Sequence, residues 1–331
     1  MYSRLRPLLF SLDPERTHSA TLWLLQLAGA FPPIAALLRR FFAYSALPVE
    51  LFGLRFPNVV GLAAGYDKDG LAWRGLATLG FGHIEIGSVT PKPQPGNPKP
   101  RLFRLPEDQA LINRMGFPSR GADFVLNRLR GSRPIRRLIV GVNLGINRST
   151  PPDNAAEDYL LLMDKFNPVA DYVVINLSSP NTPGLRTLQT GKHVDDLLRE
   201  LTRHKTKPLL VKLSPDLDEK ELEEVAGRLL EHRIEGVIAT NTTTSRPQLR
   251  SPFREEIGGL SGTPLTALSR NTVSRLYAHT GGKLPIIAVG GIISAEDAKA
   301  SLDAGASLVQ IFTGLVYRGP GLIRDILRAI S

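Results

Sequence analysis

Cysteine is absent from this chain of 331 residues, and its histidines show no regular spacing. Without thiols the protein can form neither disulfides nor thiolate metal sites, and no cysteine can act as a nucleophile or a base. The six histidines lack the H-x-x-x-H type of spacing found in metal sites. We therefore expect neither metal nor thiol chemistry.

Low-complexity tracts are also absent, and acidic residues are fewer than basic ones. The composition, 42% hydrophobic and 22% charged, is that of a globular protein with a full core. The net charge of +10 favours anionic partners. Because no zinc finger, RNP sequence or basic helix with interleaved aromatics is present, nucleic acid is not an expected partner.

An uncharged apolar segment occupies residues 20–38. Pro32 and Pro33 interrupt it, so the sequence predicts two short helices meeting at a turn over 29–33. Asp13 is the expected N-cap of the first helix and Pro14 its first residue. The second helix is expected over 33–42.

This N-terminal arm has three interpretations. The favoured one is a helical hairpin that dips its apolar face into one membrane leaflet, with Arg4, Arg6, Arg39 and Arg40 near the headgroups. A hairpin that covers the bottom of the core is the second. A transmembrane span or secretory signal is disfavoured, because no A-x-A cleavage site follows the apolar run.

Beyond residue 47, short apolar runs alternate with helical stretches. The predicted strands are 59–64, 83–88, 139–143, 172–176, 209–213, 236–240, 286–289 and 308–312. Such runs are typical of parallel strands buried on both faces, and eight β–α units predict an α/β fold of the (β/α)8 TIM-barrel type. A doubly wound sheet is the alternative, weakened because no G-x-G-x-x-G follows the first strand. We expect an arm over residues 1–43 and a barrel over residues 47–331.

The expected active site lies at the carboxyl ends of these strands. Two unusually long connections, after Ser88 and from Thr240 to Gly262, point to that end. The strand ends carry amides, hydroxyls and lysines but no carboxylate pair or histidine, which disfavours glycosidase and serine-hydrolase chemistry. Glycines after the last two strands predict a cradle for a phosphate-bearing cofactor. Lys212 lies inside an apolar run, where a charged ammonium is costly unless it meets an anion or loses its proton.

Motifs along nearly the whole chain are similar to those of one family. They lie at residues 12–16, 62–70, 91–104, 112–117, 176–186, 238–243, 258–262, 289–292 and 305–310. On these motifs the chain resembles the membrane-associated, quinone-dependent (class 2) dihydroorotate dehydrogenases of pyrimidine biosynthesis. The resemblance implies that (S)-dihydroorotate is oxidised to orotate, with one FMN per chain as hydride acceptor and ubiquinone or menaquinone as the final acceptor.

The resemblance also implies the roles of individual residues. Ser179, in the loop 176–184, would be the base that removes the C5 proton while hydride leaves C6, with Thr182 as a relay and Phe117 excluding water. His18 and Arg104 would border a quinone tunnel beneath the arm. FMN would be held by Ala64, Gly65, Lys68, Ser88, Asn143, Asn176, Lys212, Thr240, Gly262, Gly291, Thr313 and Gly314. The substrate would be held by Lys68, Asn113, Arg114, Met115, Gly116, Phe117, Asn176, Asn181, Asn241 and Thr242.

The same resemblance implies a peripheral protein on the cytoplasmic face of the inner membrane, without an obligate protein partner. Three positions depart from the family pattern, which has an aromatic hydroxyl at Phe312, threonine at Ser88 and leucine at Tyr66. These departures concern the contacts to the FMN phosphate and the quinone path.

Two other functions are weighed against this one. Another FMN barrel, acting on dihydrouridine or dihydropyrimidine, would usually carry a cysteine base, and a tRNA substrate would need a basic extension. A non-catalytic membrane-binding scaffold would have lost some of Lys68, Ser179, Lys212 and Asn241, yet all four are present.

Overall fold

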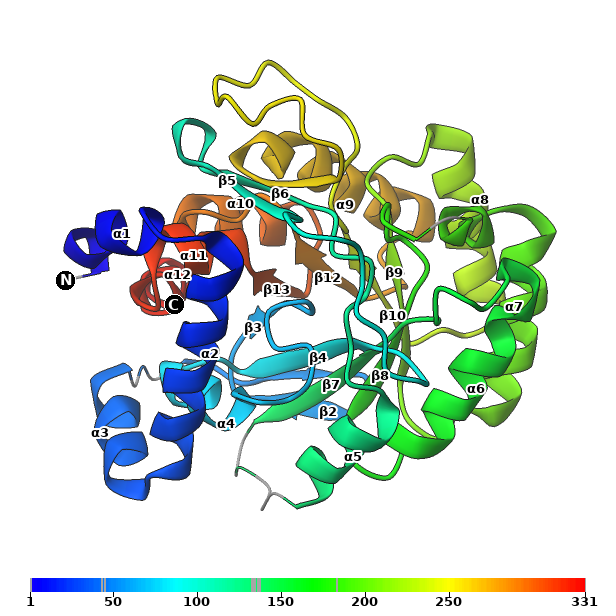
Figure 1. The fold of residues 1–331 in the computed structure, drawn as a ribbon. Helices are drawn as coiled ribbons and strands as arrows, with labels where there is room; N and C mark the ends of the chain where they lie inside the picture. Colours follow the sequence, from blue (N-terminus) through cyan, green and yellow to red (C-terminus); the bar gives the residue numbers. More distant parts are fainter. Residues whose placement is uncertain are drawn as a thin grey trace.

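A closed barrel of eight parallel strands forms the centre of the molecule (Figure 1). The structure is a computed structural model that describes residues 2–42, 44, 46–131, 135, 138–182 and 184–330; Ala43 of the predicted arm and Pro183 of the predicted catalytic loop lie outside them. The barrel strands are β3 (Val60–Leu62), β4 (His83–Val89), β7 (Ile139–Leu144), β8 (Tyr172–Asn176), β9 (Leu209–Leu213), β10 (Gly236–Ala239), β12 (Ile286–Val289) and β13 (Leu308–Ile311). The predicted TIM barrel is confirmed.

Helices surround the barrel and cover its outer face. They are α4 (Trp73–Leu76), α5 (Ala122–Arg130), α6 (Ala155–Phe166), α7 (Gly191–His204), α8 (Glu219–Glu231), α9 (Thr266–Thr280), α10 (Ala295–Asp303), α11 (Thr313–Arg318) and α12 (Gly321–Ile330). Their apolar stripes face inward: α7 buries Val194, Leu197, Leu198 and Leu201, which share one helical face. A capping box between Asp218 and Glu221 begins α8.

The amino ends of the barrel strands are closed by a hairpin of β1 (Val49–Leu51) and β2 (Leu54–Phe56). Phe56 is fully buried and packs edge-on against His83, the first residue of β4. Side chains of the hairpin join the cluster that fills the lower barrel, with Leu210 and Leu308 among its members. This hairpin, not the N-terminal arm, therefore covers the bottom of the core.

The two long connections meet over the opposite end of the barrel. The first contains β5 (Leu102–Leu105) and β6 (Ala110–Asn113), and the second contains β11 (Gly259–Gly262). These segments, predicted only as long loops, pair as a three-stranded antiparallel sheet in the order β11–β6–β5 (Figure 1). β5 and β6 are neighbours in the sequence, but β6 and β11 pair across about 150 residues, so no local sequence signal marks that second pairing.

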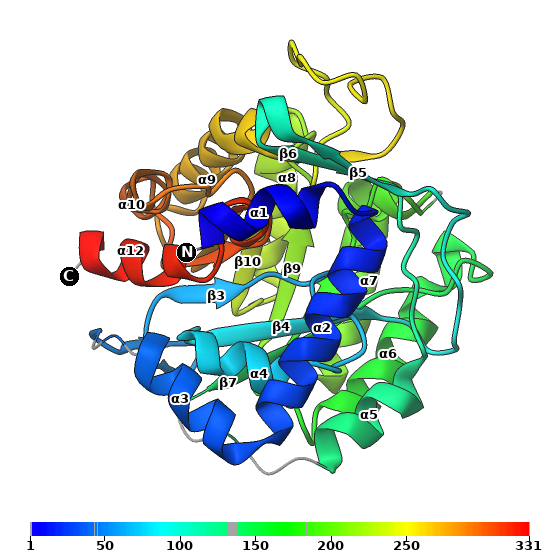
Figure 2. The same ribbon diagram turned by 60° about the vertical axis from the view of Figure 1, so that its left-hand side comes forward.

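The N-terminal arm consists of α1 (Tyr2–Phe10), α2 (Pro14–Ala30) and α3 (Pro32–Phe42). Asp13 caps α2 by accepting a hydrogen bond from Arg16 N at 2.9 Å, as predicted. The arm lies along one side of the barrel (Figure 2), where α2 packs closely on α4. At that contact a Cβ on Gly75 would lie 1.9 Å from Leu25 O, so only glycine fits.

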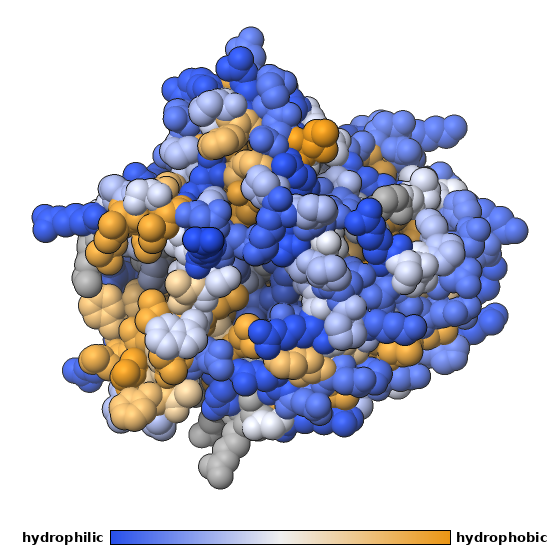
Figure 3. Space-filling view, viewed as in Figure 1, coloured by the Kyte–Doolittle hydropathy of each residue, from blue (hydrophilic) through white to orange (hydrophobic). Residues whose placement is uncertain are grey.

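The outer face of the arm is rich in exposed apolar side chains. Figure 3 shows them gathered over the part of the surface that the arm forms. They include Trp23, Leu24, Phe31, Leu37 and Phe41. Among the described residues no single helix is long and apolar enough to cross a membrane, although α2 and α3, bent by 105°, pass that test as a pair.

Candidate active site

A cavity of about 670 Å³ opens at the carboxyl ends of the strands and extends beneath the arm. It brings together most of the residues that the sequence singled out. Its walls include Ala64, Gly65, Lys68, Ser88, Asn176, Lys212, Thr240, Gly262, Gly291, Thr313 and Gly314 of the predicted cofactor set. They also include Asn113, Met115, Gly116, Phe117, Ser179, Asn181, Asn241 and Thr242 of the substrate and catalytic sets, and His18 and Arg104 of the tunnel set.

Three predicted site residues do not line this cavity. Asn143 is fully buried behind Ser88. The Arg114 side chain turns away, forming an ion pair with Glu256 at 2.6 Å and lying 4.6 Å from the centre of the Phe103 ring. Thr182 is buried in the loop that carries Ser179, and within the described residues its hydroxyl makes no hydrogen bond to Ser179.

A chain of hydrogen bonds orients the amides at the strand ends. Ser88 Oγ donates to Asn143 Oδ1, and Asn176 Nδ2 donates to Ser88 Oγ at 2.9 Å. Asn241 Nδ2 donates in turn to Asn176 Oδ1 at 3.3 Å and to Ser178 Oγ at 2.9 Å. Residues from four strand ends are thus linked, and each amide presents a defined donor or acceptor.

The cavity holds two lysines, of which Lys212 is buried and Lys68 is partly buried. Burial lowers the pKa of Lys212, partly offset by the negative charge of Glu85, and the Lys212 ammonium has no hydrogen-bond partner among the described residues. Burial likewise lowers the pKa of Lys68 to about 8, although Asp69 opposes the shift, and Lys68 Nζ donates to Gly65 O at 2.6 Å. A buried ammonium without a partner favours an anion in the adjacent space.

Sequence reasoning missed a buried polar pair, Glu85 and Gln310, of which Gln310 lines the cavity. The Glu85 carboxylate accepts hydrogen bonds from Asn143 Nδ2 at 2.7 Å and Gln310 Nε2 at 2.8 Å. Both residues are completely buried inside the barrel. Their signal was a polar side chain within an apolar strand run, the same signal that drew attention to Lys212.

Ser179 lies at the cavity wall with 6% of its surface exposed. Its Oγ accepts a hydrogen bond from Asn181 N at 3.3 Å. Asn181 Nδ2 donates to Asn113 O at 3.1 Å, which ties this loop to β6 in the sheet above the barrel. The serine hydroxyl therefore stands among amides from two covering segments, with no histidine or carboxylate bonded to it in the described part of the chain.

The backbone after the last strands approaches its surroundings closely. Gly291 has φ +73°, and a Cβ there would lie 2.3 Å from Thr266 Cα. A Cβ on Gly314 would lie 2.3 Å from Ile292 O. Beside them, the hydroxyls of Ser261 and Thr313 are 2.9 Å apart. Glycine is thus required at both positions by the neighbouring backbone, and both glycines line the cavity, where backbone N–H groups can form a phosphate cradle.

The part of the cavity beneath the arm has an aromatic wall. His18 lies edge-on to Tyr66 with ring centroids 4.9 Å apart, and Tyr66 lies 5.5 Å from Phe312. The two rings that depart from the family pattern thus contact each other, and a phenolic hydroxyl is retained at this wall. Burial lowers the pKa of His18 to about 4, so its ring is neutral at pH 7.

Arg104 joins the arm to the sheet above the barrel. Its Nη1 donates to Leu12 O at 2.7 Å, and its guanidinium lies 4.8 Å from the centre of the Phe10 ring.

Within the described residues, no group of three or more histidine or carboxylate side chains could hold a metal ion.

The fold and cavity define a class: a barrel enzyme that can hold a phosphate-bearing cofactor beside a small polar substrate, with an apolar channel leading away. The dihydroorotate dehydrogenase family model matches residues 46–331. Relatives named dihydroorotate dehydrogenase (quinone) cover the whole chain: one from Azoarcus sp. (strain BH72) is 48% identical over 98% of its own length, and one from Roseiflexus sp. (strain RS-1) is 49% identical over 93%. The chain therefore belongs to the dihydroorotate dehydrogenase family.

Solved structures agree with this assignment. A ligand-free DHODH from Eimeria tenella has a TM-score of 0.88 and 40% identity, over 96% of this chain and 94% of that one. The same protein in complex with ferulenol has a TM-score of 0.86 and 39% identity, over 96% of this chain and 90% of that one.

Proposed function

We propose that the protein oxidises (S)-dihydroorotate to orotate with bound FMN and passes the electrons to a membrane quinone, a step of pyrimidine biosynthesis. The observation that carries this proposal is the form of the cavity. Its polar end holds Lys68 and Lys212, a ring of amides and Ser179, while its other end is apolar and lies under the arm. The quinone acceptor is supported by the names of the full-length relatives.

FMN fits the residues at the polar end. The bare backbone at Gly262, Gly291 and Gly314, with the Thr313 hydroxyl, would hold its phosphate. The unpartnered ammonium of Lys212 would lie at the N1–C2=O side of the ring, where a cation stabilises the reduced form. Ala64, Gly65, Lys68, Ser88, Asn176 and Thr240 would complete the contacts, with Asn143 acting from behind Ser88. Bound FMN supplies the hydride acceptor.

The substrate would lie against the amide ring, opposite Ser179. Asn113, Asn176, Asn181 and Asn241 can donate to and accept from the imide edge of the pyrimidine, and Lys68 can meet its carboxylate. Met115, Gly116, Phe117 and Thr242 would enclose it. The Arg114 side chain, held by Glu256, would contribute only through its backbone.

Ser179 would accept the proton from C5. A serine hydroxyl is a weak base, so its efficiency depends on being held against the substrate and on passing the proton onward. Thr182 remains the candidate for that relay, and Phe117 for excluding water.

Electrons would leave through the apolar end of the cavity. His18, Tyr66 and Phe312 line its wall, and a lipid-soluble quinone matches the apolar surface beyond them. The exposed apolar face of α2 and α3, flanked by Arg39 and Arg40, would lie in one leaflet as a peripheral attachment on the cytoplasmic face of the inner membrane. Residues 1–43 would thus serve quinone access and residues 47–331 the chemistry.

Anaerobic titration tests the proposal. The purified protein should be yellow, and dihydroorotate should bleach its flavin absorbance. Quinone should then restore the colour faster than fumarate or NAD. A protein that never takes up FMN, or whose flavin dihydroorotate leaves oxidised, would refute the assignment.

A further inference from the structure

The loop that carries Ser179 is held by a hydrogen bond from an arginine that lies outside the cavity. Arg186 lies in the short 3₁₀ turn Leu185–Gln189, seven residues after Ser179, and does not line the cavity. Its Nε donates to Ser178 O at 3.2 Å. The guanidinium therefore bonds to the backbone directly beside the proposed base, while remaining out of reach of a substrate.

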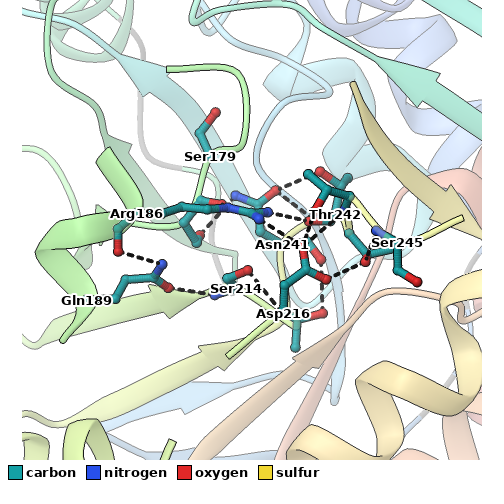
Figure 4. Close-up of polar contacts among 12 residues, drawn as sticks. Ser179, Arg186, Gln189, Ser214, Asp216, Asn241, Thr242 and Ser245 are labelled. Atoms are coloured by element: carbon teal, nitrogen blue, oxygen red, sulfur yellow. Dashed lines mark hydrogen bonds and ion pairs between the residues drawn. The ribbon is translucent and has the colours of Figure 1, made fainter. Parts of the chain in front are cut away.

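The same guanidinium reaches two other strand ends. Its Nη2 donates to Thr242 O at 3.1 Å, after β10, and its Nη1 donates to Asp216 Oδ2 at 2.8 Å, after β9 (Figure 4). Arg186 thus links the segments that follow three neighbouring strands. The rigid planar fork of an arginine suits such a three-way contact, and the flexible point charge of a lysine does not.

Asp216 is held firmly enough to serve as the anchor. It accepts hydrogen bonds from Thr243 Oγ1, from Thr244 N at 2.9 Å and from Thr244 Oγ1 at 3.0 Å. Its own N–H donates to Ser214 Oγ at 3.1 Å. Gln189 adds a second tie, because Nε2 donates to Arg186 O at 3.3 Å and Oε1 accepts from Ser214 N at 2.8 Å. Gln189 is fully buried, so both ends of this turn are fixed to the segment after β9.

These contacts close a ring around the proposed reaction centre. Asn241 Nδ2 donates to Ser178 Oγ, and Asn241 Oδ1 accepts from Thr242 N at 2.8 Å. Thr242 O then accepts from Arg186, which returns to Ser178. The loop of the base and the substrate amide Asn241 are therefore held in one frame, and Arg186 is the charged group that joins them (Figure 4).

We propose that Arg186, anchored on Asp216, is a positioning residue that fixes the Ser179 hydroxyl relative to the substrate-binding amides during proton removal. The inference rests on the proposed function of Ser179. Because a displacement of about 1 Å can slow a reaction about 10²-fold, the loss of this frame should appear mainly in the step that uses Ser179.

The test uses full-length holoenzyme and follows anaerobic flavin reduction by dihydroorotate. Arg186→Gln should slow reduction about 10²-fold, while flavin content, orotate binding and reoxidation by quinone stay near their starting values. Arg199→Gln is the matched control, because Arg199 also pairs with carboxylates but lies half-exposed on α7. It should reduce at the original rate. Asp216→Asn should resemble Arg186→Gln.

The same substitution in Ser179→Ala enzyme distinguishes a positioning role from a general loss of active-site structure. In Ser179→Ala enzyme, Arg186→Gln should slow reduction by no more than about twofold, because it acts through the hydroxyl already removed. Equal slowing in both backgrounds, or no slowing in either, would overturn the inference. If Arg186→Gln yields no holoenzyme, Arg186→Lys is measured in both backgrounds by the same criteria. A parent enzyme that dihydroorotate never bleaches would instead overturn the proposed function.

Discussion

At the scale of residues, this site separates charge from proton transfer. Its two lysines, Lys68 and Lys212, lie at the polar end of the cavity, whereas Ser179 is surrounded by neutral amides. The lysines can stabilise negative charge on a cofactor and a substrate, and the serine can take up a proton only when the substrate is held against it.

Replacement of Ser179 by alanine tests this division. Ser179→Ala should bind orotate with little change, because the amides and lysines remain. Flavin reduction by dihydroorotate should fall by about 10²–10⁴-fold, as is typical when a general base is lost. Stopped-flow absorbance measures the rate, and quinone reoxidation serves as the internal control. Reduction at the unmodified rate would remove Ser179 from its proposed role.

If Lys68 holds the orotate carboxylate as proposed, orotate affinity should depend on pH. Its pKa of about 8 lies below the ordinary 10.5, mainly because of burial, so the folded protein loses this charge as pH rises past 8. Orotate should therefore bind most tightly below pH 8 and more weakly above it, by up to about tenfold per pH unit. Titrations of orotate from pH 6 to 10 measure this, and Lys68→Met should flatten the profile. An unmodified enzyme with a flat profile would contradict the assignment.

The lowered pKa of Lys68 affects folding stability in the opposite direction, because stability rises with pH where orotate affinity falls. Between pH 8 and 10.5 the unfolded chain holds the Lys68 proton more often than the folded chain does. The contribution of Lys68 to the free energy of unfolding of the ligand-free protein should thus increase as pH rises through that window.

At the scale of elements, the arm combines two tasks. Its inner face lines the apolar end of the cavity, and its outer face leaves large apolar side chains in solvent. Exposed apolar surface of this extent on one element marks an interaction site. With the neighbouring basic residues, this surface supports the proposal of an anionic membrane as the partner.

Charged substitutions on the outer face should release the protein from lipid. Trp23→Glu and Leu37→Glu replace side chains that are 59% and 66% exposed and do not line the cavity. Each should weaken binding to anionic vesicles about tenfold or more, since burying such a side chain contributes about 1.5–3 kcal/mol. Flavin reduction by dihydroorotate should stay unchanged. Leu161→Glu, on α6 and 43% exposed, is the control that should bind vesicles normally. Equal loss in all three variants would refute a specific lipid face.

At the scale of the whole molecule, the cofactor site joins distant parts of the chain. Its proposed contacts run from Ala64 near the first barrel strand to Gly314 after the last. A ligand that binds only the folded barrel therefore stabilises all of it at once.

Removal of FMN should lower the thermal midpoint of the entire barrel. At a concentration one hundred times Kd the ligand adds about 2.7 kcal/mol. With an unfolding entropy of about 2.1 cal/mol/K per residue, that corresponds to roughly 4 °C for a chain of this size. Calorimetry of stripped and reloaded protein measures the shift, with riboflavin, which lacks the phosphate, as the comparison. If riboflavin stabilised as much as FMN, the glycine cradle would not be a phosphate site.

The sequence by itself determined the barrel, the break in the arm and the family. Each apolar run forms a buried strand, and Asp13, Pro14 and Pro32 act through local backbone geometry. Both patterns can therefore be recognised without knowledge of the tertiary structure. Residues at strand ends could be gathered into one site because a parallel barrel brings all its carboxyl ends together.

Only the tertiary structure decided how those residues are held. The pairing of β6 with β11, the Glu85–Gln310 contact and the Arg186–Asp216 ion pair join residues 30 to 225 positions apart, and no local pattern encodes such pairings. For the same reason the ion pair of Arg114 with Glu256 was not predicted. The motif specifies the position of the Arg114 backbone, but a carboxylate far away in the sequence determines the direction of its side chain. Residue type and strand position are local properties, but the direction of a long side chain depends on what the fold places beside it.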